Sequence, residues 1–451
     1  MSTKMGSILK SLSKRDVEAL KSIYDYRCLT INQIYELHYM KSLRGDNETV
    51  SDSYCKKKIN EFVELGIIEK VSHMEDDVLF LTAMGIEIIR QCFDLPTNIY
   101  DFEKRVVRRG YYRASELRIS SKYINHQLSL NQFIIDFIQK DFNVYWKYYD
   151  EKYISQFRNI RPDGLLNMLD TDFFLEMDMA TESKKQLYDK WENYRRFLVS
   201  MEFRYIERKI VVLFIIENTF NPQARIDLVK HTLSERLLDM IGPNFEIYID
   251  TKENILKLLK NKIDVLTKNK DDEGDEILRA MANYGFSVAL GERFNDFFDK
   301  AEFDFYCRKI DENNNIVIDN GRIQEYVVDS YKFAPFSVLK KIAYLIHTNL
   351  YFQDKFNRQL SYIIVGEDEK SLYRDLKIMD LLVVDNIYLT TLNRLKTMPF
   401  YSAIFQFDFL GNIHSFINPG LQDRVFECNI DDLIKEKEEE KNETKIVKKE
   451  S

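Results

Sequence analysis

The spacing of hydrophobic and polar residues near the start of the chain predicts three short helices followed by two strands. Apolar residues recur at intervals of three and four over residues 15–27, 31–37 and 51–65. Over residues 67–72 and 78–82 they alternate with polar residues, as in a two-stranded hairpin. This order is typical of a winged helix-turn-helix, whose third helix enters the major groove of DNA.

The polar face of the predicted third helix carries groups that suit contacts with DNA. Adjacent lysines and hydroxyl-bearing side chains fall there, where they can reach backbone phosphates. The residues predicted to bind DNA are Ser51, Ser53, Tyr54, Lys56, Lys57 and Lys58. The turn of the hairpin is acidic at residues 75–77, which does not favour a wing that grips the minor groove. The same pattern also fits a winged helix that binds proteins and leaves its lysines in solvent.

A basic segment follows, and we predict a helical connector over residues 96–125. Its cations are interleaved with Tyr111 and Tyr112, a composition that can follow a nucleic-acid backbone. The residues predicted to contact DNA in this segment are Arg105, Arg108 and Arg109. A solvated surface between two domains would have the same composition.

Strand-like and helical patterns then alternate over residues 126–252 and predict an α/β domain with a mixed sheet. Asp163 lies directly before one predicted strand. Glu176 and Asp178 lie two positions apart on the next strand, so their side chains share a face. Carboxylates gathered in this way repel one another unless a cation neutralises them. Their oxygen atoms suit magnesium or manganese, the predicted cofactors, which can activate water beside a phosphodiester.

Structural roles are equally open to these residues. Asp163 can terminate a turn between strands and pair with Arg161. Glu176 and Asp178 can pair with cations of the following helix, and His126 can cap a helix or fill a core.

The order of the carboxylates resembles the PD-(D/E)XK nuclease fold. In that fold a lysine follows two positions after the second acid, where this chain has Asp178. The resemblance implies either that Lys190 of the following helix replaces this lysine or that the domain binds DNA without cleaving it. The catalytic residues implied are Asp163, Glu176, Asp178 and Lys190, with the three carboxylates also as metal ligands.

The first half of the chain resembles the replication-relaxation family of plasmids and mobile elements. That family joins a winged helix to the pattern H…RPD…E-x-D-x-x-T-E…K…Y. The matching residues are His126, Arg161, Pro162, Asp163, Glu176, Asp178, Thr181, Glu182, Lys190 and Tyr194. The resemblance implies DNA binding in plasmid replication or transfer, and it does not imply a chemical activity.

The second half predicts another alternation of strands and helices, with expected strands that include residues 359–365 and 380–385. Both α/β domains contain a strand that ends in acids and precedes a helix, so the second is open to interpretation as a decayed copy of the first. Neither a phosphate-binding loop nor a dinucleotide-binding glycine motif occurs. We therefore expect no nucleotide cofactor and no ATP-driven unwinding.

Composition narrows the class of protein. The net charge of −8 excludes a uniformly basic coat protein for nucleic acid, so DNA contacts must come from local patches. Five widely spaced cysteines favour neither a zinc ribbon nor a disulfide framework and indicate a reducing compartment. No apolar run is long enough for a membrane span, and the first residues lack the apolar core of a signal peptide. We expect a cytoplasmic protein.

Together these features predict a multidomain α/β protein. The expected segments are an N-terminal winged helix-turn-helix (1–95), the basic helical connector (96–125), a central restriction-endonuclease-like α/β domain (126–252), a charged helical region (253–320), a C-terminal α/β domain (321–428) and a charged tail (429–451).

The leading interpretation of function is a sequence-specific binder of double-stranded DNA. It would act in the initiation or control of replication, or in DNA transfer, of a plasmid, phage or integrative element. Replication or transfer proteins are the expected partners, and a homodimer is expected from the winged-helix type alone. Two alternatives remain open: a metal-dependent endonuclease or nickase, and a non-enzymatic assembly or adaptor protein.

Overall fold

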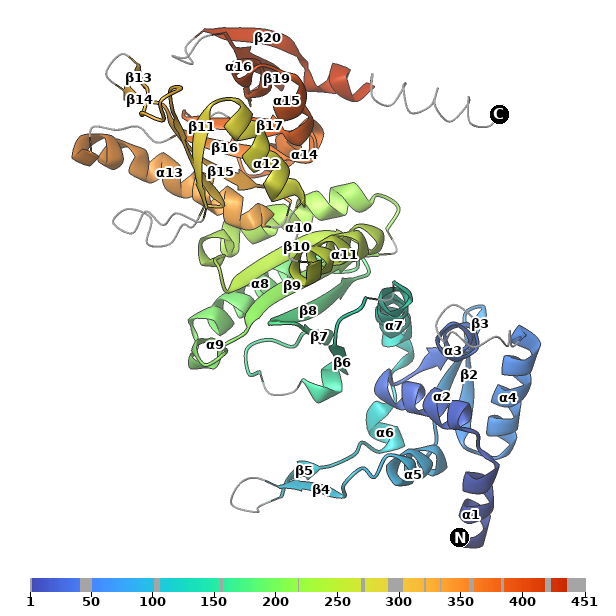
Figure 1. The fold of residues 1–451 in the computed structure, drawn as a ribbon. Coiled ribbons are helices and arrows are strands. Elements are labelled where there is room, and N and C mark those ends of the chain that lie inside the picture. The colour runs from blue at the N-terminus through green and yellow to red at the C-terminus, as the bar shows by residue number, and fades with distance from the viewer. Residues whose placement is uncertain are drawn as a thin grey trace, which may run out of the picture. The chain divides into compact units, whose positions relative to one another are not determined.

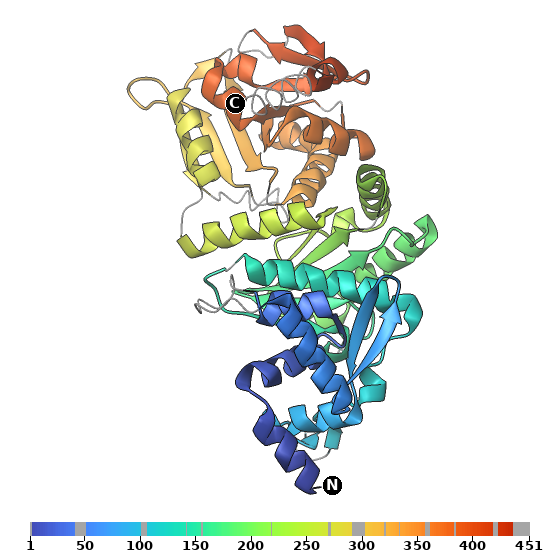
Figure 2. The same cartoon turned by 90° about the vertical axis from the view of Figure 1, so that its right-hand side faces the viewer.

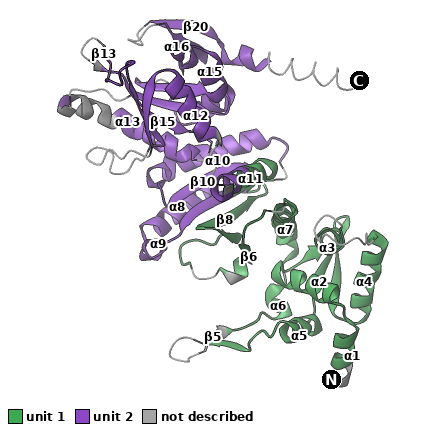
Figure 3. Ribbon diagram, viewed as in Figure 1, with its two compact units in different colours: residues 1–181, 214–218, 251–260 green, residues 182–213, 219–250, 261–451 purple. Residues whose placement is uncertain are grey.

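The computed structural model describes residues 2–40, 51–100, 106–140, 142–154, 157–217, 219–268, 272–290, 303–319, 322–332, 334–356, 361–382, 385–417 and 423–435. The chain forms two compact units (Figure 3). Unit 1 comprises residues 1–181, 214–218 and 251–260, and unit 2 comprises residues 182–213, 219–250 and 261–451.

Unit 1 begins with helices and a small antiparallel sheet (Figures 1 and 2). The elements are α1 (Ser2–Ser11), α2 (Lys14–Asp25), β1 (Leu29–Thr30), α3 (Ile31–His38), α4 (Asp52–Glu64), β2 (Ile68–His73), β3 (Asp76–Leu81) and α5 (Ala83–Cys92). The strand order is β1-β3-β2, with both pairings antiparallel. The three predicted helices and the hairpin are therefore confirmed. The polar loop expected between the second and third helices lies mainly in residues 41–50, outside the described residues.

Local sequence explains where these helices start. The side chains of Ser13 and Thr30 each accept a hydrogen bond from the backbone N–H of the third residue of their helix, as part of a capping box. The side chain of Ser51 accepts the corresponding bond at the start of α4. Ile59 and Phe62 of α4 are buried as predicted, whereas Val63 and Leu65 are only half-buried.

The prediction of a helical connector over residues 96–125 is wrong for part of this segment, which contains two strands. β4 (Asn98–Tyr100) and β5 (Val106–Arg109) form an antiparallel hairpin, followed by the short helix α6 (Ala114–Leu117) and the 3-10 turn η2 (Ser121–Tyr123). The β-branched pair at residues 106–107 favours a strand. Gly110, directly after β5, has no room for a side chain, because a Cβ atom there would lie 2.0 Å from the carbonyl oxygen of Pro96.

A five-stranded sheet with the order β10-β9-β8-β7-β6 follows. Its elements are α7 (Ile124–Gln139), β6 (Trp146–Asp150), η3 (Glu151–Tyr153), β7 (Gly164–Met168), β8 (Thr171–Asp178), α8 (Lys184–Val199), α9 (Met201–Arg204), β9 (Lys209–Ile216), α10 (Pro222–Arg236), η4 (Leu238–Met240), β10 (Phe245–Thr251) and α11 (Lys252–Lys268). β6, β7 and β8 are antiparallel neighbours. The ends of β8 and β9 meet where the backbone N–H of Glu217 donates to the carbonyl of Asp178 at 2.9 Å.

The remaining elements of unit 2 build an eight-stranded sheet with the order β11-β12-β15-β16-β17-β18-β19-β20. They are α12 (Asp272–Asn283), β11 (Phe286–Leu290), β12 (Phe305–Lys309), β13 (Ile318–Asp319), β14 (Arg322–Ile323), β15 (Glu325–Ser330), α13 (Pro335–Phe356), β16 (Ser361–Gly366), α14 (Glu369–Ile378), β17 (Ile387–Thr391), α15 (Leu392–Thr397), α16 (Phe400–Ala403), β18 (Phe405–Phe407), β19 (Asn412–Phe416) and β20 (Arg424–Asn429). β15, β16 and β17 run parallel.

Two predictions for this half are wrong. The charged region 253–320 is not only helical, because β11 and β12 belong to the second sheet, which therefore begins before residue 321. The apolar run at residues 380–385 is not the expected strand at its described positions 381–382. The strand starts at Ile387 instead, after Asn386 turns the backbone with a φ of 63°.

All five cysteines are free thiols. Among the helices of the described ranges, none combines the length and apolar character that crossing a bilayer requires.

Candidate nucleic-acid interface

The polar face of α4 is exposed. The Oγ atom of Ser51 accepts from the backbone N–H of Tyr54 at 3.4 Å and lies 2.8 Å from the Oγ atom of Ser53. The Tyr54 side chain is 44% exposed, and Lys56 and Lys57 are exposed. Since Cys55, Ile59 and Phe62 fill the core on the other side, the predicted orientation of this helix is confirmed.

The lysines of α4 are largely neutralised by acids of the same helix. The ammonium of Lys56 lies 2.6 Å from Asp52, and that of Lys58 lies 2.8 Å from Glu61. Lys57 makes no ion pair within the described residues. α4 therefore carries three lysines and three acids, and the third acid is Glu64. Exposed ion pairs of this kind contribute little to stability, so a phosphate can replace either carboxylate at low cost.

The hairpin after α4 is held by its own charges. Lys70 pairs with Asp77 at 2.8 Å across β2 and β3. The guanidinium of Arg118 donates to both carboxylate oxygens of Glu69, at 2.9 and 3.3 Å, and lies 4.2 Å from the ring centroid of Phe80. Arg118, one of the cations of the basic segment, thus fastens the hairpin to the segment that follows it.

Of the three connector arginines predicted to bind DNA, only the side chain of Arg109 is described. It donates to Glu116 at 2.8 Å, and its guanidinium lies 5.8 Å from the ring centroid of Tyr111. Arg105 lies outside the described residues, and the side chain of Arg108 is not described. The DNA contacts of all three remain predictions.

A buried polar network joins the N-terminal helices to α7, and sequence reasoning missed it. Asn131, which is fully buried, donates to the carbonyl oxygens of Tyr26 at 3.2 Å and Cys28 at 2.6 Å. Gln127 donates to Asn131 at 3.0 Å and to Asp150 of β6 at 3.1 Å. The signal in the sequence was a pair of amides four residues apart, in the same helical row as the apolar residues Ile124 and Ile134.

Arg27 completes this network. Its guanidinium lies 2.6 Å from Glu151 and 3.8 Å from Asp150, and it reaches the carbonyl of Leu117 at 3.5 Å. Burial raises the pKa of Asp150 to about 6, because the loss of hydration outweighs the attraction of Arg27. The network fixes the segment between α2 and α3 to the edge of the sheet formed by β6, β7 and β8.

The predicted acidic site lies where β7 begins and β8 ends. The register pairs Gly164 with Leu175, so Asp163 stands opposite Glu176. The Oδ2 atom of Asp163 accepts from the backbone N–H of Met177 at 2.8 Å and lies 3.2 Å from the Nε2 atom of His126. His126, for which the sequence favoured a capping or core role, is therefore a partner of Asp163.

Glu176 and Asp178 are both almost fully buried, with relative exposures of 4% and 2%. One carboxylate oxygen of Asp178 accepts from the backbone N–H of Ala180 at 3.0 Å, where the chain turns with a φ of 57°. Asp163 and Asp178 thus each hold local backbone in place.

The arrangement does not form the expected three-carboxylate metal site. Within the ranges that the structure describes, no three His, Cys, Asp or Glu side chains are grouped so that they could hold a metal ion. Lys190 belongs to unit 2, where its ammonium lies 3.1 Å from Glu182. The roles of Asp163, Glu176, Asp178 and Lys190 in catalysis, and of the three carboxylates in metal binding, remain predictions.

Comparison with known proteins adds a family. Residues 20–209 match the family model described as replication-relaxation. The matched stretch begins within α2 and ends at the first residue of β9, so it contains α4, the buried network and every motif residue from His126 to Tyr194. No curated protein and no solved structure matches the chain. The match indicates a role in the replication or transfer of a plasmid or another mobile element. Residues 20–209 are therefore similar to the replication-relaxation family, as the motif predicted.

Proposed function

We propose that this protein binds a particular duplex DNA sequence of a plasmid, phage or integrative element and acts in its replication, the control of replication, or its transfer. The observation that carries the proposal is the exposed polar face of α4 within a helix, strand, helix, helix and hairpin order. That order is the one found in winged helix-turn-helix domains, where the helix at this position reads the major groove. The match of residues 20–209 to the replication-relaxation family model supports the same role.

The contacts follow from the chemistry of α4. Ser51, Ser53 and Tyr54 offer hydroxyl groups near the start of the helix, and Lys57 offers an exposed ammonium that has no ion pair within the described part of the chain. Lys56 and Lys58 exchange their carboxylate partners for phosphates on binding. Because each exchange releases counterions from the DNA, affinity falls as salt increases.

The buried polar network supports α4 through α3. Asn131 holds the backbone that leads into α3, Gln127 links Asn131 to Asp150, and α3 packs against α4. A recognition helix on a rigid support loses less conformational entropy when it binds, which favours both affinity and specificity.

The central α/β domain acts in this proposal as a nuclease-like scaffold. Its order of helix, three antiparallel strands, helix and strand agrees with the nuclease-like prediction. One carboxylate oxygen of Asp163 and one of Asp178 accept hydrogen bonds from backbone N–H groups. These bonds favour a structural role for the two residues over cleavage of DNA.

Mobility shifts with duplex fragments of the protein's own replicon test the proposal. We expect one fragment to be preferred, and we expect Lys57→Glu to weaken binding to it by about tenfold, since a charge contact to phosphate becomes a repulsion. The matched control is Lys140→Glu, an exposed lysine at the end of α7. The absence of any preferred fragment would contradict the proposal.

Incubation of supercoiled plasmid with the protein and Mn²⁺ separates binding from cleavage. We expect the plasmid to remain intact. Nicking that disappears in Asp163→Ala would instead support the endonuclease alternative.

A further inference from the structure

Residues 272–397 repeat the element order of residues 124–268. The first series is α7-β6-β7-β8-α8-β9-α10-β10-α11, and the second is α12-β11-β12-β15-α13-β16-α14-β17-α15, apart from small insertions such as the β13–β14 hairpin (Figure 1). The strand orders also correspond: β10-β9-β8-β7-β6 in one sheet and β17-β16-β15-β12-β11 in the other.

The two series share a pair of acids at the same place in the register. β7 begins at Gly164 opposite Leu175, and β12 begins at Phe305 opposite Val328. Asp163 therefore corresponds to Asp304, and Glu176 corresponds to Asp329.

The same hydrogen bond accompanies both pairs. Asp163 accepts the backbone N–H of the residue after Glu176 at 2.8 Å, and Asp304 accepts the N–H of the residue after Asp329 at 2.9 Å. Correspondence of element order, register and this contact indicates one fold used twice.

The second acid pair, Asp304 and Asp329, differs from the first in the basic residue that it contacts. The ammonium of Lys341 lies 2.6 Å from the Oδ2 atom of Asp329, and the hydroxyl of Tyr362 donates to the same oxygen at 2.5 Å. The other oxygen of Asp329 accepts the backbone N–H of Asp304 at 2.7 Å. Asp329 is 1% exposed and Lys341 is 9% exposed. Both carboxylate oxygens are thus already occupied in a closed site.

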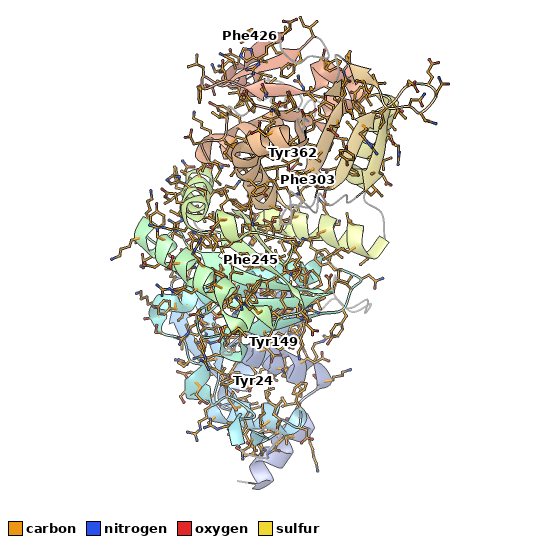
Figure 4. All side chains as sticks on the ribbon, turned by 90° about the vertical axis from the view of Figure 1, so that its left-hand side faces the viewer. Tyr24, Tyr149, Phe245, Phe303, Tyr362 and Phe426 are labelled. Carbon is orange, nitrogen blue, oxygen red and sulfur yellow. The ribbon has the colours of Figure 1, made fainter. Side chains whose placement is uncertain are left out.

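Aromatic rings help to enclose this lysine. The rings of Phe303 and Tyr362, both labelled in Figure 4, meet edge to face with centroids 5.3 Å apart. The Lys341 ammonium lies 4.9 Å from the centroid of Phe303, a distance at which the ring attracts a cation. Lys341 is also among the positive charges near the buried Glu246 of β10.

We propose that residues 272–397 are a second copy of the nuclease-like fold, in which the ammonium of Lys341 occupies the place of a divalent cation beside Asp304 and Asp329. This copy then needs no metal ion and serves as a non-catalytic module. Lys341 is the seventh residue of α13, and Lys190 is the seventh residue of α8, so the helix position is shared while the partners differ. The inference rests on the nuclease-like assignment of the first copy.

Binding of Mn²⁺ to the full chain, followed by electron paramagnetic resonance, tests this inference in an Asp163→Asn background, which removes the charge of the corresponding acid in the first copy. We expect this protein to bind no Mn²⁺ at the second copy, and we expect Lys341→Met to gain a Mn²⁺ site there. Hydrogen exchange of β15 and β16 should become faster in Lys341→Met and should slow again when Mn²⁺ is added.

The double variant Asp329→Asn, Lys341→Met supplies the control, and it also decides the outcome if Lys341→Met does not fold. With both charges gone, we expect slower exchange than in Lys341→Met and no response to Mn²⁺. Two results would overturn the proposal: Mn²⁺ bound beside an intact Lys341 and lost in Asp329→Asn, or a double variant as damaged as Lys341→Met. Since DNA binding is not the readout, failure here leaves the proposed function untouched, and the reverse also holds.

Discussion

The acid pair that contains Asp163 in unit 1 and the acid pair that contains Asp329 in unit 2 share one backbone hydrogen bond. They differ in how far Asp163 and Asp329 are buried. The Asp163 side chain is 22% exposed and meets His126, which is 30% exposed. Asp329 is closed off and contacts Lys341, whose side chain is 11% exposed. Burial therefore decides whether such an acid pair remains open to a ligand or becomes a structural ion pair.

Removing the basic residue from each site gives the largest expected difference in stability. Lys341→Met leaves a buried carboxylate without its partner, which costs about 3–5 kcal/mol of local stability. His126→Ala at the more exposed site should cost about 1 kcal/mol or less. Native-state hydrogen exchange measures both, in β15 and β16 for the first variant and in β7 and β8 for the second.

Lys377→Met, at an exposed position of α14, is the control for loss of a lysine and should change little. Equal losses in Lys341→Met and His126→Ala would contradict the role assigned to burial.

The buried amide network of unit 1 extends the comparison to uncharged groups. Asn131→Leu removes the donor to two carbonyl oxygens and should cost about 2 kcal/mol, because buried acceptors lose their partner. Exchange should quicken in α2 and α3. The matched control is Asn32→Leu, since Asn32 is exposed on α3 and, among the described residues, its side chain bonds only to Glu36. A control variant as damaging as Asn131→Leu would show that burial is not the cause.

A smaller effect is expected from pH. The pKa of Asp150 is raised to about 6 in the folded protein, so the folded state holds this proton more tightly than the unfolded chain does. Its contribution to stability is present at low pH and is lost as pH rises through about 6. We expect unit 1 to be about 1 kcal/mol more stable at about pH 5 than at about pH 7 on this account.

Asp150→Asn tests the origin of that pH dependence. The variant replaces one carboxylate oxygen by an amide NH2 group of similar size and no longer titrates, so the difference between wild type and variant isolates Asp150. Buried Glu246, whose pKa burial raises to about 7, is present in both proteins and cancels. An unchanged pH profile in β6 and α7 would contradict the assignment.

Local features of the fold were predictable from the sequence, and contacts between distant segments were not. Helical spacing predicted α2, α3 and α4, and alternation predicted the β2–β3 hairpin. Arg27, by contrast, meets Glu151 across 124 positions, which no local pattern encodes. The apolar run at 380–385 resembles a strand, yet the turn at Asn386 moves the strand beyond it.

The candidate site was predictable in its composition and less so in its electrostatics. The exposed lysines of α4 were predicted correctly. The ion pairs that neutralise two of them, with acids three and four residues away, were not predicted. Asp163 and Glu176 were correctly placed on neighbouring strands. The His126 contact with Asp163 depends on the packing of α7 beside β8, which sequence spacing does not reveal.

The salt dependence of DNA binding tests the central claim about α4 most directly. Fluorescence anisotropy of the preferred duplex should give a log–log slope against salt that is shallower by about one in Lys57→Ala than in wild type, because one phosphate contact is lost. Lys140→Ala should keep the wild-type slope. If Lys57→Ala binds with unchanged affinity and slope, α4 does not contact the duplex and the account is wrong.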